Sequence, residues 1–227
     1  MSKPEDTMTY TAVIPAFNAA DTIEQAIRSI LSQTVPAQQI VVVDDGSTDE
    51  TAELASALSD FVRVIRQQNA GVGSATTTGL NAVATPLVAT LDADDLWVPN
   101  KIALQIDYLE QNPGCDGVFG HMRTFGEGEK GGEIGPGWSR TTMLLRTEAA
   151  MRVGPVIDPP GARGDMIDWI ARAREIGVRL DMIDEVVSLR RIRPGSLSYG
   201  RDKARDRGYA KVAWLALQRK KQRGGGE

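Results

Sequence analysis

The sequence predicts an α/β fold of Rossmann-like type, in which helices cover both faces of a mostly parallel central sheet. Short β-branched runs alternate with amphipathic helical stretches through the first half of the 227-residue chain, which is the pattern of βαβ units. The run at residues 40–43 is apolar throughout, as expected for a central strand buried on both faces. Two predicted strands end in aspartates, at residues 44–45 and 92–95. Ligands of such sheets bind beyond the carboxyl ends of the strands, so these acids mark a candidate site.

The first two predicted strands are each followed by a helix. The strand at residues 11–14 ends at Pro15, and the next apolar residues recur at helical spacing: Ile23, Ala26, Ile27, Ile30 and Leu31. Two pairs of residues have the spacing of capping boxes, and we expect them to begin the two helices: Asp21 with Glu24, and Ser47 with Glu50.

The next elements bring a second group of acids to the same edge of the sheet. A third strand, a helix and a fourth strand are predicted at residues 61–65, 72–83 and 86–91. Gly73 and Gly79 lower the helix propensity of the middle segment. Asp92, Asp94 and Asp95 follow the fourth strand. Because carboxylates gathered in one place repel one another, the sequence predicts a metal or a polar ligand between them.

The second half of the chain is less regular. Strands are predicted at residues 117–122, 178–183 and 186–192, an extended segment at 142–145, and a helix at 165–176 that Gly177 ends. Residues 126–137 form a glycine-rich loop. Residues 201–219 predict a basic amphipathic helix. We expect residues 1–227 to form one domain.

Composition and charge exclude several classes of protein. The single cysteine, Cys115, precludes an intramolecular disulfide and a cysteine-rich zinc site, which favours a reducing compartment. The first ten residues lack the apolar core of a signal peptide, and no apolar run approaches the roughly 18 to 20 residues of a membrane-spanning helix. We therefore expect a cytoplasmic protein.

Three motifs in order resemble the donor-side sequence of family 2 glycosyltransferases. They are residues 12–18 (AVIPAFN) with 29–34 (SILSQT), residues 41–49 (VVVDDGSTD), and residues 90–99 (TLDADDLWVP), with Asn69-Ala70-Gly71 before the last of them. The resemblance implies a GT-A fold, transfer of one sugar from a nucleotide-diphosphate sugar with inversion, and a divalent metal, Mg²⁺ or Mn²⁺. Residues 10–110 or so would bind the donor and residues 111–195 the acceptor, followed by the basic C-terminal helix at 196–227.

The resemblance also implies which residues bind the donor. Asp45 would accept the imide N–H of the base in a UDP-, dTDP- or GDP-linked sugar. Asp92, Ala93 and Asp94 form the acidic motif, in which Asp94 would bind the metal and Asp92 would face the ribose or reach the metal through water. We expect Asp95 to cap the helix that begins near Pro99 rather than bind the metal. Further donor contacts are implied for Pro15, Ala16, Phe17, Asn69 and Gly71, with core packing as the alternative for Phe17.

Asp165 is the expected general base. Residues 164–169 (GDMIDW) are similar to the acidic motif that precedes a Trp-containing helix in the family. An inverting transferase needs a carboxylate that takes the proton of the acceptor hydroxyl, and a helix cap is the alternative role for Asp165. Contacts with acceptor or phosphate are expected from Trp138, Asp168, Trp169, Arg191 and Arg193, with packing or solvated charge as the alternatives.

The chain departs from the family pattern at one donor-side segment. Many relatives have Ala-Arg-Asn-x-Gly where this chain has Ala75-Thr76-Thr77-Thr78-Gly79, so a cation is missing there. The Gln-x-x-Arg-Trp motif of processive synthases is also absent, which favours single-sugar transfer. Two other functions are weighed: a sugar nucleotidyltransferase, whose glycine-rich phosphate loop is not found at residues 15–18, and a non-catalytic descendant that binds a nucleotide-sugar or glycan.

The basic C-terminal segment predicts a contact with an anionic partner, which the sequence does not identify. Its Lys and Arg residues could meet an anionic membrane that carries a lipid-linked acceptor, while a glycan or another acceptor is equally compatible. Solvation, covering the domain and forming a homodimer are the alternatives. We expect no nucleic-acid partner.

Overall fold

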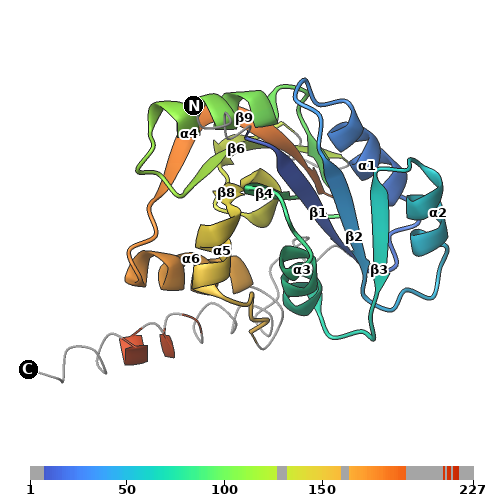
Figure 1. Cartoon of the computed structure of the whole chain (residues 1–227). Helices are drawn as coiled ribbons and strands as arrows, with labels where there is room; N and C mark the ends of the chain where they lie inside the picture. The colour runs from blue at the N-terminus through green and yellow to red at the C-terminus, as the bar shows by residue number, and fades with distance from the viewer. Residues whose placement is uncertain are drawn as a thin grey trace, which may run out of the picture.

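The computed structural model describes residues 8–126, 132–159 and 164–192, together with residues 212, 214, 215 and 217–219. Its central sheet has the strand order β3-β2-β1-β4-β8-β6-β9-β5, and β7 pairs with β6 (Figure 1). The elements of the first half are β1 (Tyr10–Ala16), α1 (Ile23–Leu31), β2 (Gln39–Asp44), α2 (Thr51–Ala57), β3 (Val62–Arg66), α3 (Val72–Asn81), β4 (Leu87–Thr90), β5 (Leu96–Trp97) and α4 (Lys101–Gln111).

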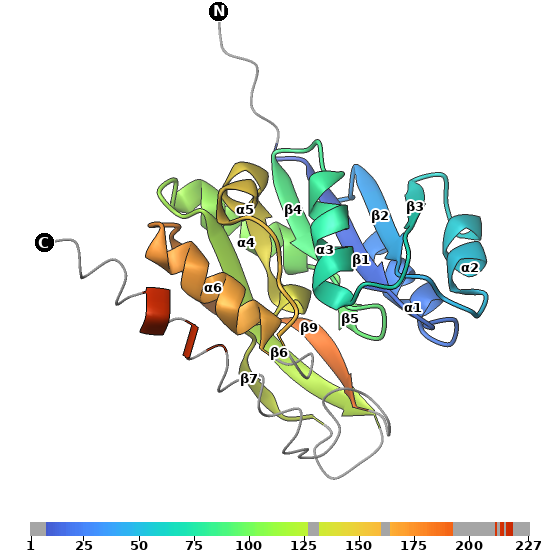
Figure 2. The ribbon, with the colours of Figure 1, turned by 90° about the horizontal axis from the view of Figure 1, so that it is seen from below.

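The second half completes the sheet and adds two helices. Its elements are β6 (Gly117–Gly126), β7 (Ile134–Pro136), the 3₁₀ turn η1 (Arg140–Thr142), β8 (Leu144–Arg146), α5 (Thr147–Val153), α6 (Asp165–Glu175) and β9 (Leu180–Ile192). The first four strands in space, β3-β2-β1-β4, are all parallel, as predicted. Beyond β4 the pairing becomes mixed, since β8 is antiparallel to both β4 and β6 while β6 and β9 are parallel. Figure 2 shows β6, β7 and β9 extending beyond the helices.

Helices cover both faces of the sheet, which confirms the predicted layers. Alternate residues of β1 pack on one face against α1 and α4, and on the other against α3. Gly79 allows α3 to approach β1 closely, because a Cβ atom there would lie 2.2 Å from Val13 Cγ1. Close packing therefore explains why Gly79 lies inside a helix, although glycine lowers helix stability. Among the described residues, none of the helices is long and apolar enough to cross a membrane.

The two predicted capping boxes do not form. The helices α1 and α2 begin after Thr22 and Glu50, and neither of these residues makes a side-chain cap. Ser47 Oγ instead accepts a hydrogen bond from Asn18 N at 2.9 Å, and Asp49 Oδ2 accepts one from Ala20 N at 3.1 Å. These long-range bonds tie the loop after β1 to the loop after β2, and they replace the local caps that the sequence predicts.

Two segments of the second half also differ from the prediction. Residues 178–183 and 186–192, expected as two strands, lie mainly within the single strand β9, whose register against β6 shifts near His121. The extended segment expected at residues 142–145 begins instead with the turn η1, and β8 follows it. Of the predicted C-terminal helix, residues 212, 214, 215 and 217–219 are helical, and the rest lies outside the described residues.

Candidate active site

The three acids that follow β4 lie in a tight loop at the carboxyl end of that strand. Asp95 N donates to Asp92 O at 3.0 Å, so the chain turns back within four residues. Asp92 and Asp94 are partly exposed, whereas Asp95 is 4% exposed. Burial, and then the charges of Asp92 and Asp94, raise the pKa of Asp95 well above its usual value. Three carboxylates crowded in this way repel one another while they are charged.

Asp95 does not cap the following helix, contrary to the prediction. Its Oδ1 accepts a hydrogen bond from Arg191 N at 2.8 Å, and its Oδ2 accepts one from Thr141 Oγ1 at 3.0 Å. The strand β5 separates Asp95 from α4, whose N-cap position is Asn100. Asp95 therefore ties the acidic loop to β9 and to η1.

Arg140, in η1, joins two predicted site residues that are far apart in the sequence. Its Nη2 donates to Asp165 Oδ2 at 2.5 Å. Its Nε lies 3.0 Å from Asp92 Oδ1, an ion-pair contact whose angle does not make a hydrogen bond. Arg140 is 7% exposed. Burial lowers the pKa of Arg140, but the carboxylates around it, led by Asp92 and Asp165, raise it by more. The guanidinium therefore stays charged between the two acids.

Asp165 is the first residue of α6 and does not occupy the N-cap position. That position belongs to Gly164, which has a left-handed backbone with φ 99°. The helical cap considered as an alternative is therefore not what holds Asp165. Its buried carboxylate points to Arg140 instead, toward the loop that carries Asp92.

The acceptor-side residues expected from the sequence lie in varied surroundings. Asp168 is buried and accepts hydrogen bonds from Arg172 Nε at 2.8 Å and Arg219 Nη1 at 2.9 Å. Trp169 is 1% exposed, and its Nε1 donates to Gly154 O at 3.0 Å, so it belongs to the core. Trp138 is exposed and packs on Phe119 with ring centroids 4.9 Å apart. Contact of these residues with an acceptor stays a prediction.

Arg191 does not point into free space. Its Nε donates to Asp94 O at 2.9 Å, and its Nη2 donates to Gln25 Oε1 at 2.7 Å. It thus fastens the acidic loop to α1 with two of its five N–H groups, and its contact with phosphate stays a prediction. Arg193 lies outside the described residues.

The donor-side residues gather at the carboxyl ends of β1 and β2. Asp45 Oδ1 accepts hydrogen bonds from Gln67 Nε2 at 2.7 Å and Ala70 N at 3.0 Å, and Oδ2 accepts one from Gly71 N at 2.9 Å. The turn that contains Asn69 is therefore built around Asp45. Pro15 and Ala16 are buried at the end of β1, whereas Phe17 is 51% exposed. The exposure of Phe17 argues against the packing role considered for it.

Two residues of this region were missed by the sequence analysis. Arg140 Nη1 donates to Thr76 Oγ1 at 3.3 Å, so a cation lies beside the segment that lacks one in the sequence. Asp158 accepts a hydrogen bond from Gly73 N at the start of α3, at 2.9 Å for Oδ1 and 2.8 Å for Oδ2. Burial raises the pKa of Asp158, and the charge of Asp165 adds to this rise. No motif in the sequence marks either Arg140 or Asp158.

The predicted metal ligands, Asp92 and Asp94, both lie in the acidic loop and are partly exposed. In the described part of the chain, no three His, Cys, Asp or Glu side chains form a metal-binding group.

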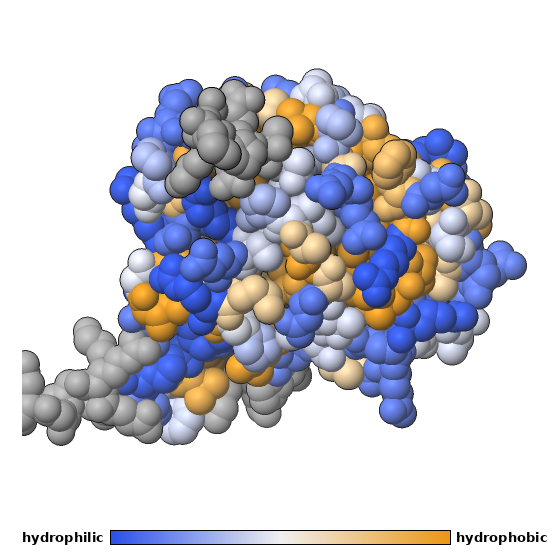
Figure 3. All heavy atoms as spheres, in the orientation of Figure 1, coloured by the Kyte–Doolittle hydropathy of each residue, from blue (hydrophilic) through white to orange (hydrophobic). Residues whose placement is uncertain are grey.

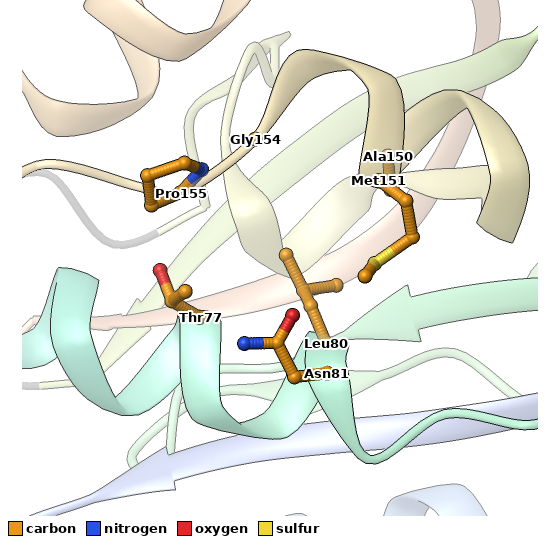
Figure 4. A pocket seen from close by; sticks show the side chains of 7 residues that line it. All are labelled: Thr77, Leu80, Asn81, Ala150, Met151, Gly154 and Pro155. Carbon is orange, nitrogen blue, oxygen red and sulfur yellow. The ribbon is translucent and has the colours of Figure 1, made fainter.

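A pocket of about 250 Å³ lies elsewhere, between α3 and α5. Its lining is mainly apolar and consists of Thr77, Leu80, Asn81, Ala150, Met151, Gly154 and Pro155 (Figure 4). On this face of the molecule, apolar side chains gather around α3 and α5 (Figure 3). Its lining contains no acid and none of the predicted site residues, so the acidic loop and Asp165 remain the candidate site.

Comparison with known sequences establishes the family. Residues 11–159 match the sequence profile described as Glycosyl transferase family 2. Because this match covers more than half of the chain, the chain belongs to glycosyl transferase family 2. An uncharacterized glycosyltransferase of Nostoc sp. is 36% identical over 119 residues, which is 51% of this chain and 37% of the relative. The chain thus spans well under half the length of that relative.

Solved structures support the same fold. The structure of S. aureus TarS 1-349 in complex with UDP-GlcNAc matches with a TM-score of 0.75 at 19% identity, over 92% of this chain and 65% of the TarS 1-349 chain. The mannosyltransferase PcManGT from Pyrobaculum calidifontis, in complex with GDP-Man and Mn²⁺, matches with a TM-score of 0.65 at 20% identity, over 86% of this chain and 61% of PcManGT. At these identities the likeness concerns the fold, which is the predicted GT-A type.

Proposed function

We propose that this chain transfers a single sugar from a nucleotide-diphosphate sugar to an acceptor hydroxyl, with inversion at the anomeric carbon. The observation that carries the proposal is the meeting of Asp92 and Asp165 around one buried guanidinium. The first acid belongs to the donor-side loop and the second begins α6. Their convergence at the carboxyl edge of the sheet is what a reaction between two bound substrates requires.

In this mechanism Asp165 is the general base. The acceptor oxygen attacks the anomeric carbon while the bond to the diphosphate oxygen breaks, and the diphosphate leaves with the bonding electron pair. Asp165 takes the proton of the attacking hydroxyl. Arg140 contacts its Oδ2, so we assign Oδ1 to that proton. A single displacement of this kind inverts the configuration at the anomeric carbon.

Asp92 and Asp94 would hold a divalent cation, Mg²⁺ or Mn²⁺. When bound, such an ion stabilises the negative charge that develops on the leaving diphosphate. The presence of Mn²⁺ in the PcManGT complex supports this assignment.

The donor is proposed to be a UDP-, dTDP- or GDP-linked sugar. TarS is described with UDP-GlcNAc and PcManGT with GDP-Man, so this fold accommodates more than one base. Asp45 is the proposed partner of the base, and it also orders the turn formed by Asn69, Ala70 and Gly71. A glycan or lipid-linked acceptor is compatible with the acceptor side. The membrane contact proposed for the basic C-terminal segment concerns residues that are mostly outside the described ranges.

Calorimetry with a panel of donors tests the proposal. UDP-, GDP- and dTDP-sugars are titrated into the wild type with and without Mn²⁺, and into the variants Asp94→Ala and Asp107→Ala. Asp107 is an exposed aspartate on α4 and is the matched control. We expect Mn²⁺-dependent binding of one donor that Asp94→Ala abolishes and Asp107→Ala retains. Failure of every donor to bind would contradict the proposal. Binding without any turnover would favour the non-catalytic descendant.

A further inference from the structure

The turn that carries Arg140 is held in place by side chains from three other elements. Four consecutive carbonyl oxygens, those of residues 140–143, each accept a side-chain hydrogen bond. The donors, which we call the carbonyl clamp, are Thr90 Oγ1 at 2.6 Å, Trp97 Nε1 at 2.9 Å, Gln105 Nε2 at 2.7 Å and Lys101 Nζ at 3.1 Å, in that order along the turn. They come from β4, β5 and α4.

The four clamp donors are buried. Burial of polar groups is costly unless each one finds a partner, and an apolar side chain of similar size would fill the same space. Burial of Lys101 has the largest free-energy cost of the four, because a charged amine loses its hydration. The same burial lowers the pKa of Lys101 well below the usual value. Its Nζ also donates to Gln105 Oε1 at 2.6 Å and lies 4.4 Å from the centre of the Trp97 ring. A satisfied polar network of this kind specifies one conformation of the segment that it binds.

The clamped turn contacts both sides of the candidate site. Thr141 Oγ1 lies within hydrogen-bonding distance of Asp92 Oδ2, at 3.1 Å, and of Asp95 Oδ2, at 3.0 Å. Arg140 contacts Asp92 with Nε and Asp165 with Nη2. A displacement of the turn would therefore move the acidic loop and the proposed base relative to each other.

We propose that Arg140 is a positioning residue that fixes Asp165 relative to the donor-side acids, and that the carbonyl clamp fixes Arg140. The inference rests on the function proposed above for Asp92 and Asp165. A guanidinium suits this task because it is planar and presents N–H groups in several fixed directions. A lysine ammonium at position 140 would keep the charge, but it is a single point charge and would not span the two carboxylates in the same way.

The clamp is tested first, with variants that need no substrate. Thr90→Val is nearly isosteric and removes the bond to Arg140 O. Thr85→Val is the matched control, because Thr85 precedes β4 at its other end and its buried hydroxyl also donates to a carbonyl oxygen, Leu87 O at 2.8 Å. We expect about tenfold faster exchange of the Thr142 and Met143 amide hydrogens in Thr90→Val, with no such change in Thr85→Val. Equal exchange rates of these two amide hydrogens in Thr90→Val and Thr85→Val would show that the carbonyl clamp does not hold the turn.

Arg140 is tested by the kinetics of donor hydrolysis, measured as release of nucleotide from the donor that binds with Mn²⁺. We expect Arg140→Lys to lower kcat about 100-fold with little change in the donor KM, because small misplacements of reacting groups cost about that much. Added guanidinium should restore part of the rate of Arg140→Ala, whereas urea, which has a similar shape and no charge, should not. A raised donor KM at unchanged kcat would overturn the positioning role and make Arg140 a donor-binding residue.

The two proposals fail in different ways. If the wild type neither binds nor hydrolyses any donor, the proposed function is wrong. The hydrogen-exchange experiment then still decides whether the carbonyl clamp holds the turn. If the wild type is active and Arg140→Lys retains full activity, the positioning role is wrong while the proposed function stands. Thermal unfolding of each variant verifies that it is folded before its kinetics are interpreted.

Discussion

At the scale of single residues, Lys101 is a buried polar group that binds the turn carrying Arg140 without contacting the candidate site itself. Its amine meets two acceptors, Gln105 Oε1 and Met143 O. A neutral amine still has two N–H groups, so both bonds survive loss of the proton. Burial favours this neutral form, which is why the pKa of Lys101 is lowered.

The lowered pKa of Lys101 predicts how stability depends on pH. Between its lowered folded value and 10.5, its ordinary value, the unfolded chain binds one proton more than the folded protein. The free energy of unfolding therefore rises with pH in this range, by up to about 1.4 kcal/mol per pH unit. Lys101→Met lacks this contribution, so the stability of the wild type relative to Lys101→Met should rise with pH in urea unfolding. Parallel curves for the two proteins would contradict the assignment.

At the scale of elements, close packing of α3 on β1 positions the donor side of the site. The helix begins at the turn built around Asp45, and Thr76, within it, meets Arg140. Gly79 permits the approach, since an added Cβ would lie 2.2 Å from Val13 Cγ1 and 3.2 Å from Val43 Cγ2. The sequence marks Gly79 only as a poor helix residue, because the strands that it packs against are distant in the chain.

Gly79→Ala should therefore destabilise the protein even though alanine favours helices. We expect a loss of about 1–3 kcal/mol in the free energy of unfolding, the typical cost of overpacking a core. Gly114→Ala is the control, because a Cβ at Gly114 would meet only Arg179 Nη1, at an ordinary 3.6 Å. Urea denaturation measures both. Equal stability of the two variants would show that α3 can shift freely.

At the scale of the whole molecule, the sequence predicts the first half much better than the second. The parallel strands and the acids at their ends follow from local periodicity and turn chemistry. The second half depends on contacts that no local pattern records. Asp184 and Glu185 interrupt the apolar pattern of residues 178–192, yet the strand β9 continues through them because β6 tolerates a shift in register. Asp95 likewise departs from its predicted cap because its partners lie in η1 and β9.

The candidate site follows the same division. The donor-side acids could be named from the sequence, and so could Asp165 from a family resemblance. Arg140 could not, because its role depends on a fold that brings η1 between Asp92 and Asp165. The carbonyl clamp could not be predicted either, since its donors are ordinary core positions in the sequence.

The proposed function depends on Asp165 acting as the base for sugar transfer. The most direct measurement compares donor turnover by Asp165→Asn with that by Asp184→Asn, in which an aspartate with a fully exposed side chain carries the same substitution. We expect Asp165→Asn to lower kcat by roughly 10²- to 10⁴-fold, the usual contribution of a general base, and to leave donor binding by calorimetry unchanged. Asp184→Asn should behave like the wild type. Turnover by Asp165→Asn at the wild-type rate would show that Asp165 is not the base.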